Sequence, residues 1–239
     1  MTRSPSKLWW GLAALRQIVL RHDPVSRSAI RPAPIVVAGR GHASWKVPAA
    51  VLRPGMIIYA AGVGLDTTFD EAMVETHGAV VHAFDPTPRS IVHARAVVER
   101  LPGFHFHPVG LWKEDTDLVF HAPANPEHVS HSVTALQGHN PGFTATCKRI
   151  STLMRELGHD AIDLLKIDIE GAEYEVLSDL VASRIPVRAI CVEFDETNFP
   201  QDQHWRDRIA AAVSGLHAAG FDLAAVAPKG NYTFLARAH

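Results

Sequence analysis

From about Val51 onward, the hydrophobic positions follow the period of a strand and then that of a helix, in repeated alternation. Short apolar runs predict strands, whereas apolar residues three and four positions apart predict helices with one buried face. The predicted strands span residues 56–61, 79–84, 104–109, 162–168 and 187–194, and helices are expected to begin near Phe69, Pro88, Ile150, Ala172 and Trp205. Strands that alternate with helices favour right-handed crossovers, so we expect a doubly wound α/β sheet.

Two regions interrupt this alternation. The chain closes with two apolar runs, at residues 221–226 and 232–236, joined by a Pro-Lys-Gly-Asn turn that favours an antiparallel pair. Residues 113–148 are less regular, with short strands expected at 118–120 and 143–147 around a loop that contains three prolines. The fold class that we predict is therefore a Rossmann-like sheet with a closing antiparallel hairpin.

Residues 1–48 differ from the rest and are predicted to form an arm, a helix plus an extended segment, ahead of a domain at 49–239. The apolar stretch at 8–15 contains a Trp-Trp pair, but it is too short to span a bilayer. It also lacks a small-residue cleavage site, so we do not expect a secretory signal. An amphipathic helix here would pack on the domain, on a second copy of the chain or on a membrane surface. A homodimer and a membrane-surface contact both stay open.

Composition and charge narrow the class of protein. The chain has 239 residues, of which 47% are hydrophobic and 20% charged, as in an ordinary soluble domain. A formal net charge of −2 gives no electrostatic reason to expect a nucleic-acid partner. Cys147 and Cys191 are far apart, so no disulfide framework is indicated and a cytoplasmic location is the default expectation.

The fifteen histidines are more than usual for this length. His105 and His107 alternate on one strand face, and His128 and His131 are three residues apart with His139 beyond them. Histidines at such spacing can bind a metal ion. Scattered surface histidines are the more common arrangement, and we prefer that interpretation.

The ends of the first three predicted strands carry features suited to a ligand of the adenosine type. The first strand runs into 61–66, Ala-Gly-Val-Gly-Leu-Asp, where two glycines allow a tight turn and a close approach to a ligand. The second strand ends about twenty residues on, at Asp85 before Pro86, where a carboxylate can reach ribose hydroxyls. The alternative is that Asp85 caps the turn before Pro86. The third strand ends at Gly110 and Leu111, which could hold an adenine ring.

Acids follow the next two predicted strands. Residues 163–173 begin as a strand and end as a helix, with Lys166, Asp168 and Glu170 where a buried strand normally has apolar residues. Glu193 follows the next strand, so these acids are expected on one side of a cleft. They could act as a general base, hold substrate hydroxyls or, together with Asp195, hold a divalent cation. The alternative is a set of salt-bridged or solvated acids.

The run at 163–173, Asp-Leu-Leu-Lys-Ile-Asp-Ile-Glu-Gly-Ala-Glu, resembles the signature of the FkbM-type methyltransferases, and the other features agree in order. The resemblance implies a class I methyltransferase fold that binds S-adenosylmethionine (SAM) and methylates a hydroxyl of a sugar, glycan or natural product. It implies cofactor contacts from Ala61, Gly62, Gly64, Asp66, Asp85, Pro86, Gly110, Leu111 and Asp168. We expect Asp168 or Glu193 to take the hydroxyl proton, with support from Lys166 and Glu170, and with His131 as a further candidate in a lid formed by residues 113–148.

One position departs from the family pattern. The family usually has an acid two residues before the first glycine, where this chain has Ala60, and Asp66 is our candidate replacement. The departure keeps open a non-catalytic subunit that binds SAM or a nucleotide. A nicotinamide-dependent oxidoreductase is the other alternative, although the third glycine of its fingerprint is missing. Dependence on a divalent metal stays open.

Overall fold

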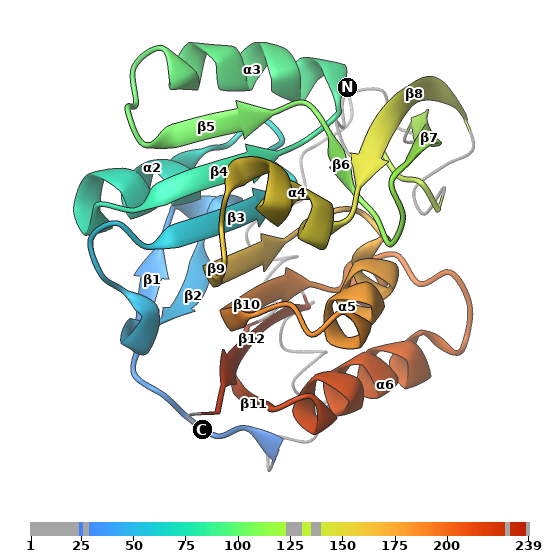
Figure 1. Cartoon of the computed structure of the whole chain (residues 1–239). Coiled ribbons are helices and arrows are strands. Elements are labelled where there is room, and N and C mark those ends of the chain that lie inside the picture. Colours follow the sequence, from blue (N-terminus) through green and yellow to red (C-terminus); the bar gives the residue numbers. More distant parts are fainter. Residues whose placement is uncertain (1–23, 26–28, 123–130, 135–139, 228–229, 238–239) are drawn as a thin grey trace, which may run out of the picture.

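The computed structural model describes residues 24–25, 29–122, 131–134, 140–227 and 230–237 (Figure 1). The helix expected at 8–15, His128, His139 and the turn residues 228–229 lie outside these ranges. Within them, no helix is long and apolar enough to cross a membrane.

The main sheet of the described chain has seven strands. They are β3 (Ile57–Ala61), β4 (Val80–Phe84), β5 (Phe104–His107), β9 (Ile162–Ile167), β10 (Val187–Glu193), β11 (Phe221–Ala227) and β12 (Asn231–Ala236). Their spatial order is β11-β12-β10-β9-β3-β4-β5, with β12 antiparallel to both β10 and β11 and the other pairs parallel. The structure thus confirms the expected doubly wound sheet with a closing antiparallel hairpin.

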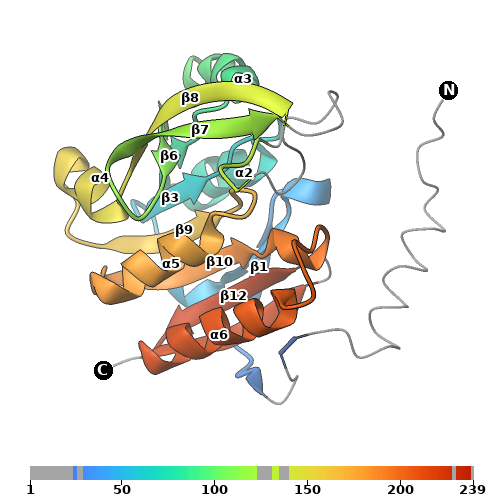
Figure 2. The same ribbon diagram turned by 90° about the vertical axis from the view of Figure 1, so that its right-hand side faces the viewer.

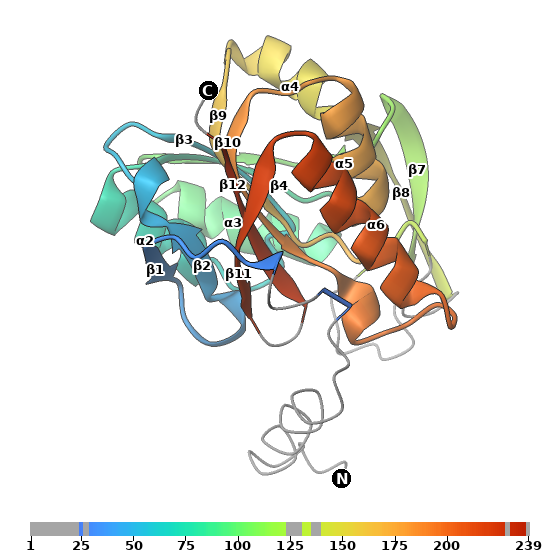
Figure 3. The same ribbon diagram turned by 90° about the horizontal axis from the view of Figure 1, so that it is seen from below.

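Helices cover both faces of this sheet. They are α2 (Thr68–His77), α3 (Pro88–Val98), α4 (Ile150–Leu157), α5 (Glu173–Ala182) and α6 (Trp205–Ala218), with short 3-10 turns at Gly41–Ala43, Ala49–Val51 and Asp195–Thr197. Seen from below, α5 and α6 lie on one side of the sheet, and α2 and α3 lie on the other (Figure 3). Because a parallel sheet must be covered on both faces, this arrangement leaves only its strand ends open to a ligand.

The alternation of side chains along β9 shows how one strand serves two cores. Leu165 and Ile167 are fully buried in the core beneath α4, α5 and α6, whereas Leu164 belongs to the core beneath α2 and α3. Full burial of one such side chain contributes about 1.5–3 kcal/mol to stability. Lys166 shares the face of Leu164, and its charge therefore lies at the end of an otherwise apolar core.

A hairpin of β1 (Ile35–Ala38) and β2 (Trp45–Pro48) packs on the same face as α2 and α3. Trp45 and Val47 are buried there, and the Thr233 hydroxyl donates a hydrogen bond to the Lys46 carbonyl at 2.8 Å. This hairpin lies within the segment that we predicted to be an arm. Residues 35–48 therefore share a core with the domain that follows them.

The irregular region contains a second, three-stranded sheet. It consists of β6 (Gly110–Leu111), β7 (Thr116–Ala122) and β8 (Asn140–Lys148), in the order β6-β8-β7. The strands β7 and β8 are longer than the two that we expected, and β6 lies just ahead of the irregular region. It stands beside the ends to which the parallel strands point (Figures 1 and 2). A bridge between His121 and Ser132 ties residues 131–134 to β7.

Four histidines pack together on the face of β4 and β5 that carries Phe84. The ring of His82 stacks on those of His105 and His107, with centroids 5.0 and 5.3 Å apart, and meets the His159 ring edge-on at 4.7 Å. Burial, with smaller effects of the neighbouring histidines, lowers the pKa of His82 to about 4, and burial also lowers the pKa of His107 and His159. In the described part of the chain, no three His, Cys, Asp or Glu residues are arranged to hold a metal ion.

This cluster predicts a loss of stability in mild acid. An unfolded histidine takes up a proton near pH 6.5, whereas His82 in the folded chain resists protonation until about pH 4. The unfolded state therefore binds more protons in this window, so the free energy of unfolding falls as the pH is lowered from 6.5 toward 4. We expect His82→Phe to reduce that fall by on the order of 2 kcal/mol, measured by urea unfolding between pH 8 and pH 4.5.

His217→Phe is the control, because it removes an exposed histidine that lies outside the cluster. If His82→Phe and the wild type lost stability in parallel over this range, the histidine cluster would not be the source of the acid sensitivity.

Candidate functional site

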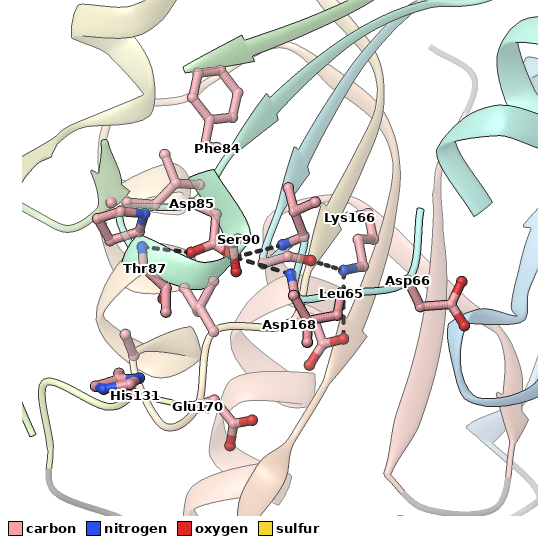
Figure 4. A pocket seen from close by; sticks show the side chains of 18 of the residues that line it. Leu65, Asp66, Phe84, Asp85, Thr87, Ser90, His131, Lys166, Asp168 and Glu170 are labelled. Carbon is pink, nitrogen blue, oxygen red and sulfur yellow. Dashed lines mark hydrogen bonds and ion pairs between the residues drawn. The ribbon is translucent and has the colours of Figure 1, made fainter. Parts of the chain in front are cut away.

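A cavity of about 220 Å³ opens at the carboxyl ends of β3, β4 and β9 (Figure 4). Its walls come from the loop after β3, the residues that follow β4 and β9, the start of α2 and the β6 strand. Three outlying segments complete it, namely residues 42–45, Phe120 of β7 and residues 131–133. Open α/β sheets bind ligands at this edge.

Gly62 begins the loop after β3 and lies against the backbone that follows β9. Its φ is +81°, and a Cβ atom there would lie 1.7 Å from the Asp168 carbonyl oxygen, so only glycine fits. The Asp168 amide donates to the Ala61 carbonyl at 3.1 Å, and the Gly62 amide donates to the Phe84 carbonyl at 3.0 Å. The ends of three strands are therefore joined at one point. Gly64, by contrast, has open space where a Cβ would lie.

Asp85 holds the same loop from the end of β4. Its Oδ2 accepts hydrogen bonds from the amides of Val63 at 2.9 Å and Gly64 at 3.0 Å, and its Oδ1 accepts one from the Thr87 amide at 2.8 Å (Figure 4). Asp85 therefore caps this turn, as in the alternative interpretation of the sequence, and also borders the cavity. Two carboxylate oxygens offer about four acceptor positions, so capacity is left for a ligand hydroxyl.

Lys166 supports the loop from β9. Its ammonium group donates to the carbonyl oxygens of Ala61, at 3.3 Å, and Gly62, and lies 3.4 Å from Asp168 Oδ2. It also lies 5.3 Å from the centre of the Trp45 ring, a cation–π contact. These contacts offset the cost of burying the Lys166 charge, and they engage the N–H donors of its ammonium group within the protein. The arrangement suits a residue that positions the loop and Asp168.

Asp168 and Glu170 both border the cavity (Figure 4). The side chain of Asp168 is 35% exposed, so a ligand can reach it. Glu170 has a φ of +56°, which is uncommon for a residue with a side chain. The hydroxyls of Ser132 and Thr134 donate to its carbonyl, so the insertion between β7 and β8 holds this backbone in place. The same contact brings His131 to the cavity wall.

The end of the cavity near β5 is apolar and narrow. It is lined by Gly110, Leu111 and Phe120, and a Cβ on Gly110 would lie 2.7 Å from Cys147 Sγ. Ser90 of α3 borders the cavity as well, and its buried hydroxyl has no hydrogen-bond partner among the residues that the structure describes. An apolar slot beside an unpaired hydroxyl suits a flat, partly polar ring.

Glu173 and Asp195 form a buried acid pair behind the site. Glu173 Oε1 accepts hydrogen bonds from the amides of Gly171 at 2.9 Å and Ile169 at 3.3 Å, which fixes the turn between β9 and α5. The two carboxyl groups lie close enough to repel each other, and Glu173 Oε2 and Asp195 Oδ2 are buried without a hydrogen-bond partner among the residues that the structure describes. Burial raises the pKa of Glu173 to about 7, and burial together with repulsion from Glu173 raises the pKa of Asp195.

Most residues predicted from the sequence meet in this one cavity. Those that line it are Gly62, Gly64, Asp66, Asp85, Pro86, Gly110, Leu111, Lys166, Asp168, Glu170 and His131. Ala61 and Glu193 are not among the lining residues. Ala61 is buried at the end of β3, and Glu193 accepts a hydrogen bond of 3.4 Å from the Asn198 side chain. Asp195 lies in the acid pair.

The sequence analysis did not identify Trp45, Asp70 or Ser90 as residues of the site. Trp45 comes from a hairpin in the predicted arm, and the other two come from the first turns of α2 and α3. An acid in the first turn of a helix usually stabilises that turn, so its type and position carried no distinctive signal. Only the packing of α2 against the sheet turns Asp70 toward the cavity.

The close contact at Gly62 predicts a large effect of a single methyl group. Gly62→Ala must displace the Asp168 backbone as well as accept a left-handed conformation, so we expect it to destabilise the protein by at least about 2 kcal/mol more than Gly158→Ala. Gly158 is the matched control, because its φ of +73° is similar and a Cβ there meets open space. Chemical unfolding of both variants tests this, and equal losses of stability would contradict it.

The acid pair makes a contribution to stability that declines from mildly acidic to neutral pH, opposite in sign to the contribution of His82. Because the pKa of Glu173 in the folded state, about 7, lies above its ordinary value of 4.5, the folded chain holds more protons between these values and loses stability as the pH rises through them. Glu173→Gln keeps an acceptor oxygen and removes the charge that repels Asp195. We expect the variant to be more stable than the wild type at pH 8, with the difference shrinking toward pH 5, in thermal unfolding.

Glu175→Gln removes a partly exposed carboxylate, paired with Lys113 at 2.9 Å, from the same helical turn and is the control for a general effect of charge. A stability gain of equal size in both variants would mean that the buried charge of Glu173 is not responsible.

Comparison with known proteins identifies the family. The family described as "Methyltransferase FkbM domain" matches residues 59–223. The chain is 28% identical over 125 residues to the probable methyltransferase-like protein 24 of Homo sapiens, covering 52% of this chain but only 28% of that protein. It is 25% identical over 177 residues to the 31-O-demethyl-FK506 methyltransferase FkbM of Streptomyces tacrolimicus, covering 62% of this chain and 68% of that protein.

Among solved structures, Aeropyrum pernix fibrillarin in complex with natively bound S-adenosyl-L-methionine aligns with a TM-score of 0.47 and 11% identity, over 90% of this chain and 86% of that chain. The bifunctional kinase-methyltransferase WbdD aligns with a TM-score of 0.45 and 13% identity, over 80% of this chain and 36% of that chain. The family match covers more than half of the chain and confirms the resemblance seen in its sequence. The protein belongs to the FkbM methyltransferase-domain family.

Proposed function

We propose that this chain transfers the methyl group of SAM to a hydroxyl oxygen of a sugar, glycan or natural product. The observation that most supports this proposal is the cavity itself. The glycine loop, Asp85 and Asp168 meet there, at the carboxyl ends of strands that belong to a methyltransferase domain. The name of the Streptomyces tacrolimicus relative describes a methyltransferase that acts on a 31-O-demethyl compound, which favours an oxygen acceptor. A polyhydroxylated small molecule is therefore our proposed substrate class.

The residues of the cavity fit such a cofactor. The loop that contains Gly62 and Gly64 borders the cavity, and Asp85 has acceptor capacity left for ribose hydroxyls. The unpaired Ser90 hydroxyl and the apolar wall at Leu111 suit an adenine ring near β5. The Asp168 carboxylate lies farther along the sheet, toward β9, where the reacting end would lie.

The chemistry divides between the cofactor and the protein. SAM supplies an electrophilic methyl group on a sulfonium centre. The protein aligns the acceptor oxygen with that methyl, and well-oriented reactants can gain roughly 7–11 kcal/mol in this way. The methyl–oxygen bond would form as the methyl–sulfur bond breaks, with S-adenosylhomocysteine as the leaving group. Asp168 would accept the hydroxyl proton, and Lys166, 3.4 Å away, would hold the carboxylate in place.

Other parts of the site have supporting roles in this proposal. Glu170 and His131 border the same side of the cavity and are placed to contact the acceptor. The insertion that carries His131 would exclude water from the reacting groups. Glu193 lies outside the cavity, so we prefer Asp168 as the base of the two that the sequence suggested.

Asp168→Asn tests the proposed base. We expect it to lower kcat by about 10²-fold or more, because the isosteric amide cannot accept the proton. Transfer of a labelled methyl group from SAM to a panel of sugars and polyhydroxylated natural products provides the assay. Glu193→Gln, outside the cavity, should retain kcat near the wild-type value.

The outcomes separate the competing functions. Full turnover by Asp168→Asn would exclude the Asp168 carboxylate as the base. Tight binding of SAM without transfer to any acceptor would favour the non-catalytic subunit, and binding of NADH in place of SAM would favour an oxidoreductase. A cytoplasmic location, the absence of a nucleic-acid partner and a dimer or membrane contact through the N-terminal segment stay predictions.

A further inference from the structure

Asp70 of α2 is a buried carboxylate that borders the cavity. The residue is only 5% exposed, and its Oδ1 has no hydrogen-bond partner among the residues that the structure describes. Leaving a buried acceptor without a donor costs free energy. Such a group in the wall of a binding cavity is best explained by a donor that arrives with the ligand.

The electrostatic surroundings of Asp70 favour a cation as that donor. Burial raises its pKa to about 6, against the attraction of Lys166, while Glu71 and Asp66 add repulsion. The ammonium group of Lys166 is already engaged with the carbonyls of the glycine loop and with Asp168. A bound cation would restore the charged form of Asp70 and satisfy its open acceptor.

The position of Asp70 selects which part of the cofactor it meets. Asp85 follows β4, and the apolar slot lies farther out, near β5, whereas Lys166 belongs to β9 on the other side of β3. Asp70 interacts with Lys166 and therefore lies toward the β9 end. With ribose at Asp85 and adenine in the slot, the amino-acid end of the cofactor extends in that direction.

Asp66, the replacement carboxylate that we predicted from the sequence, is less suited to this task. It is exposed, and its Oδ1 already accepts a hydrogen bond from the Thr68 amide at 3.0 Å, at the start of α2. An exposed charge contributes little to binding, because water screens it. Asp70 is buried and has an open acceptor.

We propose that Asp70 binds the ammonium group of the methionine part of SAM, at the end of the cavity opposite the adenosine slot. This inference rests on the proposed function. It makes Asp70 a cofactor-binding residue supplied by a helix rather than by a strand end.

Two ligands that differ only in the amino-acid part test the assignment. S-adenosylhomocysteine carries the ammonium group, whereas 5′-methylthioadenosine retains the adenosine and the sulfur but lacks it. We expect Asp70→Asn to weaken binding of S-adenosylhomocysteine by at least about tenfold and to leave binding of 5′-methylthioadenosine unchanged, in calorimetric titrations. Glu75→Gln, an exposed acid on the same helix, is the control and should change neither affinity.

Thermal unfolding without ligand checks that the variant folds, and Asp70→Ser provides a second variant. At pH 6, binding of S-adenosylhomocysteine should release protons from the wild type and fewer from Asp70→Asn, measured in buffers of different ionisation enthalpy. A merely structural role for Asp70 would not produce this difference. The charged groups that face Asp70 in this experiment are Lys166, Glu71 and Asp66.

Equal effects on the two ligands, or no effect on either, would overturn the assignment while leaving the methyltransferase proposal intact. A selective loss in Asp66→Asn but not in Asp70→Asn would move the role to Asp66 and would also overturn it. If the wild type binds neither ligand, the proposed function itself fails, and this inference falls with it.

Discussion

The site depends on one backbone contact, the approach of Gly62 to the carbonyl oxygen of Asp168. No side chain fits between them. The Asp168 amide, in turn, donates a hydrogen bond to the Ala61 carbonyl. This contact joins the end of β3 to the end of β9, and the Phe84 carbonyl adds β4 through the Gly62 amide. The glycine loop, the second-strand acid and the candidate base are therefore parts of one rigid junction.

Charge is buried around this junction in two different ways. Lys166 is compensated by carbonyls, by Asp168 and by the Trp45 ring, so it stabilises the loop that it contacts. Asp70 and the acid pair of Glu173 and Asp195 are compensated poorly, and burial raises their pKa values. Titratable groups with strongly shifted pKa values tend to gather at binding and catalytic sites. Asp70 borders the cavity, whereas the acid pair fixes the turn behind it.

Segments remote in sequence complete the walls. The β1–β2 hairpin supplies Trp45. The insertion between β7 and β8 supplies His131 and donates a hydrogen bond to the Glu170 carbonyl. A doubly wound sheet alone leaves its strand ends open to solvent. These additions enclose one side of the site. In the proposed function, the acceptor would therefore meet residues from segments of the kind that vary most readily in length and sequence.

The sequence by itself determined the alternation of strands and helices, the closing hairpin and the strand-end residues of the site, because hydrophobic period and glycine placement are local signals. It also indicated the family through the run at 163–173. The tertiary structure alone decided that Asp85 caps the glycine loop, that Glu193 lies outside the cavity and that Trp45, Asp70 and Ser90 lie within its wall. These outcomes depend on which helix face packs on the sheet and on which buried groups find partners. Contacts between distant segments settle both, and a local pattern does not contain them.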